Sequence, residues 1–332
     1  MSNPPTSSIE LLKKALISEG FTTRELELGI KKTPYTVLTD KEGNNLLVNS
    51  VNPLYPFTTS SARAVSKDKL KAYDLVKTLD IAIPKTRVID RDDGFNSTED
   101  LLKIGPKFVV KPYDGAGGLA VTVGVDSKAK LESALNDVFE HTNTALVQQQ
   151  VEGEEIRFLV IKGKVEAAIM RQRPRVVGDG KASVSELIQA ENSARAQIKD
   201  TLITYPTLTE QHIEAALFSS NDILADGEVR VLGTGTMIKT GASILNVLKE
   251  VHSSYITIAE KAAQLFGKGL IVVDVIIKDH TQAATESNYA FIEFNLCPAL
   301  AMFYSCRDGN HSNVVEDFIS PMLQDVIKGP KT

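Results

Sequence analysis

The sequence predicts a mixed α/β protein with a small N-terminal unit. Strand-like and helix-like segments alternate along most of the chain, and a glycine-dense loop joins two strand-like runs in residues 106–124. With 332 residues, of which 42% are hydrophobic, the chain can bury a substantial core. This length allows one large or two to three smaller domains, and we expect three units, in residues 1–64, 65–150 and 151–330.

The first 90 residues contain a helix, a hairpin, a second helix and a strand. Residues 8–20 have helical periodicity and end at a glycine, and residues 36–49 form a hairpin about the turn Glu42-Gly43-Asn44. A second helix runs from about Lys67 to Leu79, and Pro84 introduces the following strand.

Residues 106–124 read as a strand that ends in Lys111, a glycine-dense loop and a second strand. Glycines tolerate positive φ and carry no Cβ, so the loop can fold its amides over phosphate oxygens while Lys111 supplies a charge. The glycines concerned are Gly115, Gly117 and Gly118. Taken alone, such a loop is more often a plain hairpin turn, and it matches neither a Walker sequence nor GxGxxG. We expect residues 112–120 to form a lid that becomes ordered when nucleotide binds.

The middle of the chain continues the alternation. A helix is predicted over residues 126–141, a strand over 144–151, and two strands between Glu154 and Glu166 that meet at the turn Lys162-Gly163. Ser183 and Glu186 form a capping box that opens another helix. Residues 195–226 are polar and helix-like, without a chemical signature.

Two apolar runs near the end of the chain carry potential metal ligands. Glu293 and Asn295 lie two residues apart in a strand-like segment and therefore share a face, and Asp274 lies in the run GLIVVDVII. Carboxylate and amide oxygens suit a magnesium ion that carries phosphate. The alternative, a polar strand edge without a metal, has about equal weight on the local residues alone. The phosphate-binding loop upstream favours the metal.

The ordered set of VVKP with DGAGG, VQQQVEGEEIRFLV, VVGDGKASVSELI, VVDVII and IEFNLCP resembles the ATP-grasp superfamily. Within it, the set is similar to the ATP-grasp regions of cyanophycin synthetase and of bifunctional glutathione synthetase. The resemblance covers about residues 60–330 and implies two α/β lobes that sandwich a nucleotide. Both relatives carry a further catalytic domain, which we do not expect in this chain.

The resemblance implies several nucleotide-binding residues. The segment from Gln148 to Val151 would read the adenine edge through an amide and backbone groups, although a polar strand end is an equal alternative. Glu155 would accept hydrogen bonds from ribose hydroxyls, and Lys69 would approach the phosphates, although a helix lysine is more often solvated. All of these lie before or at the start of the second lobe.

The candidates for phosphoryl transfer are Arg171, Lys239 and Gly241. Arginine suits a carboxylate or a migrating phosphoryl group. Arg157 would face the same cleft, with an ordinary surface arginine as an equal alternative, and Arg173 is the alternative to Arg171. Residues 237–243 occupy the place of the family's loop near the γ-phosphate and could donate hydrogen bonds to developing charge. Here the loop lacks the family's asparagine and paired glycines.

The resemblance implies an ATP-dependent carboxylate-amine ligase that forms a peptide or amide bond through an acylphosphate. ATP with Mg²⁺, or Mn²⁺ as the alternative ion, would be the cofactors, and an amino acid or short peptide the substrate. Two rivals remain: a nucleotide-binding regulatory module without catalysis and a small-molecule kinase. The retained set of metal ligands argues against the regulatory module.

Composition excludes several other classes. The net charge of −5 and the lack of a basic cluster argue against a nucleic-acid partner. The N-terminus has no apolar signal region and no run of about 18 apolar residues occurs, so we expect no membrane partner and a cytoplasmic location. Cys297, Cys306 and the five scattered histidines show no zinc or disulfide pattern, and we expect reduced thiols. A homodimer is left open.

Overall fold

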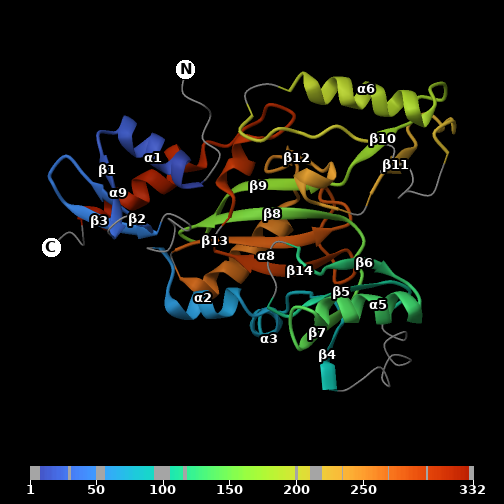
Figure 1. Cartoon of the computed structure of the whole chain (residues 1–332), viewed down its shortest axis with the longest axis horizontal. Helices are drawn as coiled ribbons and strands as arrows, with labels where there is room; N and C mark the ends of the chain where they lie inside the picture. Colours follow the sequence, from blue (N-terminus) through green and yellow to red (C-terminus); the bar gives the residue numbers. More distant parts are fainter. Residues whose placement is uncertain are drawn as a thin grey trace.

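The computed structural model describes residues 8–28, 31–49, 57–92, 105–114, 118–198, 201–209, 219–233, 235–267, 269–296 and 298–328. The strands in these ranges form sheets of five, four, three and two strands (Figure 1). Among the described helices, none is long and apolar enough to cross a membrane.

The N-terminal unit consists of one helix packed beside a three-stranded antiparallel sheet. Its elements are α1 (Ser8–Ser18), β1 (Thr22–Leu28), β2 (Lys31–Thr39) and β3 (Asn45–Asn49). The predicted hairpin is confirmed: the Asp40 carboxylate accepts hydrogen bonds from the backbone N and the Nδ2 of Asn44 across the turn. Leu12 and Leu16 of α1 are fully buried in a core shared with the five-stranded sheet.

Two short helices, α2 (Ser60–Ser66) and α3 (Lys69–Lys77), follow the N-terminal unit. The helix predicted from about Lys67 to Leu79 is confirmed as α3, whereas α2 was not predicted. The Asp68 side chain accepts hydrogen bonds from the backbone N of Leu70 and Lys71, which caps α3 and separates it from α2. Both helices pack against β14 of the five-stranded sheet.

The four-stranded antiparallel sheet has one face covered by α5 (Lys128–Phe139). Its order is β4 (Thr86–Asp90), β7 (Thr144–Gln149), β5 (Phe108–Pro112) and β6 (Thr122–Val125). Phe108 and Val110 face α5. Because side chains alternate, the intervening Val109 and Lys111 face the other way, and Gln148, the register partner of Val109, shares that face.

The five-stranded antiparallel sheet is the centre of the molecule (Figure 1). Its order is β12 (Ser243–Asn246), β9 (Lys164–Gln172), β8 (Glu154–Ile161), β13 (Leu270–Ile277) and β14 (Tyr289–Asn295). The predicted turn at Lys162-Gly163 joins β8 and β9 and is confirmed. The core on one face contains residues of α8 (Ser253–Ala263), α2 and α3. The other contains residues of α1, the 3₁₀ helix Leu300–Tyr304 and α9 (Ser320–Lys328).

A β-bulge at Ile292 determines which face of the sheet each side chain of β14 lies on. Asp274 pairs with Glu293, but the next position, Val275, pairs with Phe291, so Ile292 is the extra residue. Phe291 and Phe294 consequently pack into the same core. Glu293 turns to the opposite face, beside Asp274, and the alternation puts Asn295 on that face as well.

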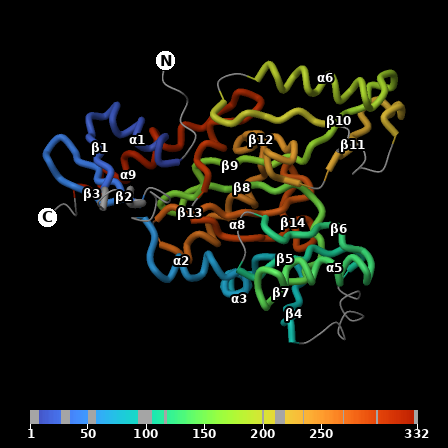
Figure 2. The backbone as a smooth tube through the Cα atoms, in the orientation of Figure 1, coloured from blue at the N-terminus to red at the C-terminus, as the bar shows by residue number. Residues whose placement is uncertain are grey.

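An arm at the edge of the sheet contains α6 (Val184–Ala196), β10 (Arg175–Val177) and β11 (Val229–Val231), as the backbone trace shows (Figure 2). The capping box of Ser183 and Glu186 is confirmed. The helical expectation for residues 195–226 was wrong in the parts described, because α6 ends at Ala196 and residues 201–209 are irregular. Pro206 and the β-branched residues around it disfavour a helix there. Residues 210–218 lie outside the described ranges.

Candidate functional site

Two buried lysines mark the junction between the two larger sheets. Lys69 on α3 is 9% exposed and Lys111 on β5 is 7% exposed. Burial lowers the pKa of Lys111 to about 8, against the opposing attraction of Glu293 and Glu155. Burial also lowers the pKa of Lys69, and the Lys69 Nζ lies 3.9 Å from Glu293 Oε2. Two buried ammonium groups on neighbouring elements favour the binding of an anion between them.

Tyr73, which the sequence reasoning missed, connects α3 to the four-stranded sheet. Its hydroxyl accepts hydrogen bonds from Gln148 Nε2 at 3.1 Å and from Lys111 Nζ at 3.4 Å. Burial raises the pKa of Tyr73 to about 12, so the hydroxyl stays protonated. Tyr73 follows Lys69 by one helical turn, and this i, i+4 spacing could have predicted that both face the same site.

The inner face of the four-stranded sheet combines apolar and amide groups. Val109 pairs with Gln148 on one side and with Val123 on the other, so the three share one face. Val123 is 37% exposed although it is a strand valine. The Gln148 Nε2 also donates to Thr86 Oγ1 at 2.7 Å, which fixes the amide. A flat apolar surface with an oriented amide beside it suits a planar heterocycle.

The predicted metal ligand Asp274 is held by Arg157. The side chain of Asp274 is 1% exposed, and its two carboxylate oxygens accept hydrogen bonds from Arg157 Nε at 2.8 Å and Nη2 at 2.7 Å. The Arg157 Nη1 also contacts Met302 Sδ at 3.8 Å. Burial, and then repulsion by Glu155 and Glu293, raises the pKa of Asp274 against the pull of Arg157. The two parallel hydrogen bonds identify a charged pair.

Glu155 lies on the same face of the sheet and is already engaged by several donors. Its Oε1 is 2.6 Å from Arg171 Nη1, on the register partner, and 3.6 Å from Arg157 Nη2. Its Oε2 accepts from Thr236 Oγ1 at 3.3 Å, and Arg171 Nε donates to the Thr236 carbonyl at 2.9 Å. Arg173, the alternative to Arg171, instead pairs with Glu154. A carboxylate offers about four lone-pair sites, so Glu155 retains capacity for a further donor.

The loop of residues 237–243 lies next to this cluster through Thr236. Gly241 has a φ of +89°, a conformation that favours glycine, and Lys239 is exposed to solvent. Gly118 has a φ of +73°, and a Cβ at this residue would lie 3.6 Å from Met237 Cε, so the end of the glycine-dense segment touches this loop. Gly115 and Gly117 lie outside the described residues, and the lid stays a prediction.

Val151 follows β7 in the short connection between the two sheets. Gly153, in the same connection, has a φ of +130°, and a Cβ there would lie 2.2 Å from the Ile277 carbonyl oxygen. The connection therefore passes directly over the end of β13, where only glycine fits. This close approach brings the ends of β7 and β8, and so Gln148 and Glu155, into neighbouring positions.

The residues at this site fit a divalent cation. Asp274 and Glu293 are direct register partners, and Asn295 adds an amide oxygen on the same face, which gives a hard-oxygen donor set. The repulsion that raises the pKa of Asp274 is the repulsion that a cation would relieve. A separate group of Asp137, Glu140 and His141 is exposed, as such groups commonly are without an ion.

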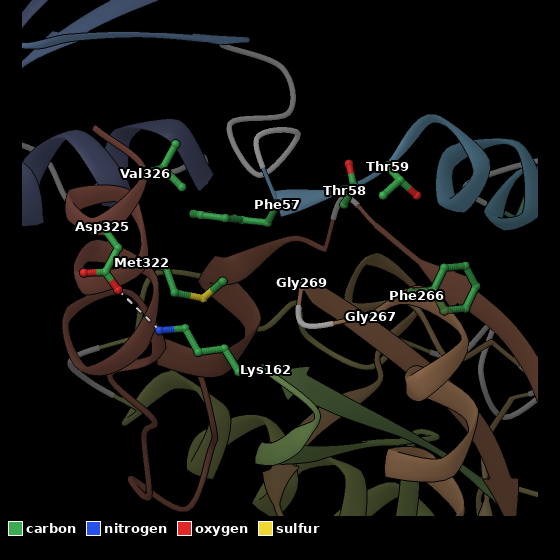
Figure 3. A pocket seen from close by; sticks show the side chains of 10 residues that line it. All are labelled: Phe57, Thr58, Thr59, Lys162, Phe266, Gly267, Gly269, Met322, Asp325 and Val326. Atoms are coloured by element: carbon green, nitrogen blue, oxygen red, sulfur yellow. Dashed lines mark hydrogen bonds and ion pairs between the residues drawn. The ribbon is translucent and has the colours of Figure 1, made fainter. Parts of the chain in front are cut away.

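A pocket of about 470 Å³ lies elsewhere, beside the turn at Lys162 (Figure 3). It is bordered by residues 57–59, by Phe266, Gly267 and Gly269, and by α9. The ion pair between Lys162 Nζ and Asp325 Oδ2, at 3.4 Å, also lies at its border. Lys162 follows the end of β8 opposite to Glu155. The pocket therefore belongs to the other end of the sheet and holds none of the predicted site residues.

Comparison with known proteins identifies similar sequences and a similar fold. Residues 66–216 match the model of the RimK-like ATP-grasp domain. The chain is 28% identical over 251 residues to the glutathione biosynthesis bifunctional protein GshAB of Streptococcus thermophilus, covering 71% of this chain and 33% of that protein. It is 28% identical over 228 residues to cyanophycin synthetase of Geminocystis herdmanii, covering 67% of this chain and 26% of that protein.

Among solved structures, a bifunctional glutathione synthetase from Pasteurella multocida has a similar fold, with a TM-score of 0.63 and 20% sequence identity. The alignment covers 95% of this chain and 44% of the synthetase chain. The fold is thus an ATP-grasp fold, and the predicted fold class is confirmed. Residues 66–216 are similar to the RimK-like ATP-grasp domain, and the predicted resemblance to the two synthetases is confirmed. It spans about a third or less of the length of these curated relatives.

Proposed function

We propose that this chain is an ATP-dependent carbon-nitrogen ligase that joins a carboxylate to an amine. The observation that carries the proposal is that Lys69 and Lys111 both lie near Glu293, the register partner of Asp274. The Lys69 Nζ is 3.9 Å from Glu293 Oε2, and Glu293 attracts the charge of Lys111. Ammonium groups that can bind phosphate oxygens and carboxylate oxygens that can bind a metal ion therefore occur at the same site. The similarity to two synthetases of the ATP-grasp type supports the same class.

The nucleotide would lie between the two larger sheets. The amide of Gln148 and the apolar surface of Val109 and Val123 would hold the base, and Glu155 the ribose. Lys69 and Lys111 would hold the phosphates together with the amides around Gly118. Asp274, Glu293 and Asn295 would hold Mg²⁺, or Mn²⁺ in its place, which would neutralise charge on the phosphate oxygens.

The reaction would proceed in two steps, phosphoryl transfer to the carboxylate and attack of the amine on the resulting acylphosphate. A carboxylate oxygen of the first substrate attacks the γ-phosphorus of ATP, and the bond from that phosphorus to the bridging oxygen of ADP breaks. The amine nitrogen of the second substrate then attacks the acyl carbon. The bond between that carbon and the phosphate oxygen breaks, phosphate leaves, and the nitrogen loses a proton to give the amide.

The contribution of the chain is positioning and charge stabilisation. Arg171 lies close enough to Glu155 to be held rigidly, and it would stabilise the charge of the transferring group together with Lys239 of the loop that ends at Gly241. No covalent intermediate on the protein is required. Closure of the segment around Gly118 would keep water from the acylphosphate.

The substrates we propose are amino acids or short peptides. The test is ADP release with and without members of an amino-acid and peptide panel, followed by mass detection of condensed products. Amine-dependent ADP release with an amide product is the expected result. ADP release without an amine, with a phosphorylated product, would identify a kinase instead, and nucleotide binding without turnover would identify a binding module. Cytoplasmic location and a homodimer stay predictions.

A further inference from the structure

A buried cluster of two arginines and one glutamate ties the arm to the loop of residues 237–243. Arg195, in the last turn of α6, has a side chain that is 2% exposed. Its Nη2 donates to the Gly241 carbonyl oxygen at 2.8 Å and to Ser243 Oγ at 3.3 Å. Its Nε donates to Glu191 Oε1 at 2.8 Å, and its Nη1 donates to the Pro206 carbonyl oxygen at 3.2 Å. One guanidinium thus bridges three segments.

Arg307 completes the cluster from the C-terminal part of the chain. Its Nη1 and Nη2 donate to the two oxygens of Glu191 at 2.7 and 3.1 Å, and its backbone N donates to the Ile244 carbonyl oxygen at 2.9 Å. Glu191 therefore orients both guanidinium groups. The hydrogen bond to the carbonyl of Gly241 comes from Arg195 and not from Arg307.

Tyr205 attaches the same arm to β12 a second time. Its hydroxyl donates to the Ser305 carbonyl oxygen at 2.5 Å and accepts from the backbone N of Ile244 at 3.2 Å. Residues 201–209 showed no chemical signature in the sequence, yet Tyr205 and Leu208 are buried. This segment therefore supports the strand that follows the loop.

We propose that Arg195 is a positioning residue for phosphoryl transfer, because it fixes the end of the loop that carries Lys239 and Gly241. The proposal rests on the proposed function. Arg171 holds the start of the loop through the Thr236 carbonyl, and Arg195 holds its end through the Gly241 carbonyl. The Gly241 N–H is satisfied within the turn by the Ile238 carbonyl oxygen at 2.9 Å, and Arg195 supplies the side-chain donor to the Gly241 carbonyl.

The first test compares Arg195→Met with Arg230→Met. Arg230 pairs with Glu228 on the same arm and serves as the matched control. Active sites are counted by titration with an ATP analogue. Arg195→Met should then lower kcat on the order of 10²-fold, because a displacement of the loop of residues 237–243 by about 1 Å is enough for a loss of this size. Its analogue Kd should stay within about twofold of the parent value, since Lys69 and Lys111 are untouched. Arg230→Met should keep both values.

A second variant covers the case in which Arg195→Met fails to fold. Arg195→Lys keeps the charge, but an ammonium lacks the planar fork that reaches Glu191 and Gly241 together, and about a tenfold loss of kcat is expected. Unchanged kcat per binding site in the folded variants would overturn the proposal, as would equal losses of kcat and analogue affinity.

Hydrogen exchange separates a failure of this proposal from a failure of the proposed function. If the parent protein turns over no ATP, the proposed ligase is wrong. The amides of residues 240–243 should still exchange faster in Arg195→Met than in Arg230→Met, because the loop has lost its anchor. Equal protection of these amides in both variants would show that Arg195 does not hold the loop.

Discussion

Replacing Lys111 by methionine is expected to stabilise the nucleotide-free protein while weakening ATP binding. Burial lowers the pKa of Lys111 from 10.5 to about 8 in the folded state. A shift of this size means that keeping the ammonium charged inside the fold costs about 3 kcal/mol at pH 7. Methionine removes that cost and forfeits one hydrogen bond to the Tyr73 hydroxyl, worth about 1 kcal/mol. The expected net gain is about 2 kcal/mol.

The sign of this effect can be checked by its pH dependence. Between about 8 and 10.5, Lys111 is neutral in the folded parent protein and still protonated when unfolded. The unfolded state therefore binds more protons, and the stability of the parent protein rises with pH in this window. The advantage of the methionine variant should be constant below pH 8 and should shrink as the pH approaches 10.5.

The assay is urea unfolding of both proteins at several pH values, combined with nucleotide titration at pH 7. Lys111→Met should have the larger free energy of unfolding at pH 7 and a markedly weaker affinity for magnesium-bound ATP. A variant less stable than its parent at pH 7 would refute the reasoning about burial. Unchanged ATP affinity would remove Lys111 from the phosphate site.

Three further substitutions test neighbouring parts of the site. Glu293→Gln removes one ligand charge at nearly constant volume and should abolish most turnover, so that near-normal rates at saturating magnesium would exclude Glu293 from the metal set. Arg157→Met leaves Asp274 buried and unpaired and should lower the free energy of unfolding by about 3–5 kcal/mol, measured in urea; a loss below about 1 kcal/mol would contradict a charged pair. Gly153→Ala puts a Cβ 2.2 Å from the Ile277 carbonyl oxygen and should destabilise by about 1–3 kcal/mol, so an unchanged melting curve would argue against this close approach.

Local patterns predicted most elements that lie in the two large sheets. The turn at Lys162-Gly163 and the capping box of Ser183 and Glu186 depend on neighbouring residues and were predicted correctly. Helix α2 was missed, although Thr59, whose hydroxyl accepts a hydrogen bond from the backbone N of Ala62, was present as an N-cap signal. Pro206 could likewise have warned against a helix over residues 195–226.

Other features depend on contacts between segments that are distant in the sequence, so neighbouring residues do not predict them. Simple alternation would put Phe291, Glu293 and Asn295 on one face, but the bulge at Ile292 sends Phe291 into the opposite core and turns Glu293 toward Asp274. The burial of Lys69 arises in the same way. A helix lysine is normally solvated, and only the packing of α3 between two sheets encloses it.

The most direct test of the central claim follows a labelled oxygen. Once a substrate pair is identified, the reacting carboxylate is enriched in ¹⁸O, and the released phosphate is analysed by mass spectrometry. Attack of the carboxylate on the γ-phosphorus makes one carboxylate oxygen part of the phosphate, and attack by the amine then breaks the bond from carbon to that oxygen. We predict one labelled oxygen in each phosphate released. Phosphate without label, formed together with the amide, would contradict an acylphosphate route and with it the proposed function of this site.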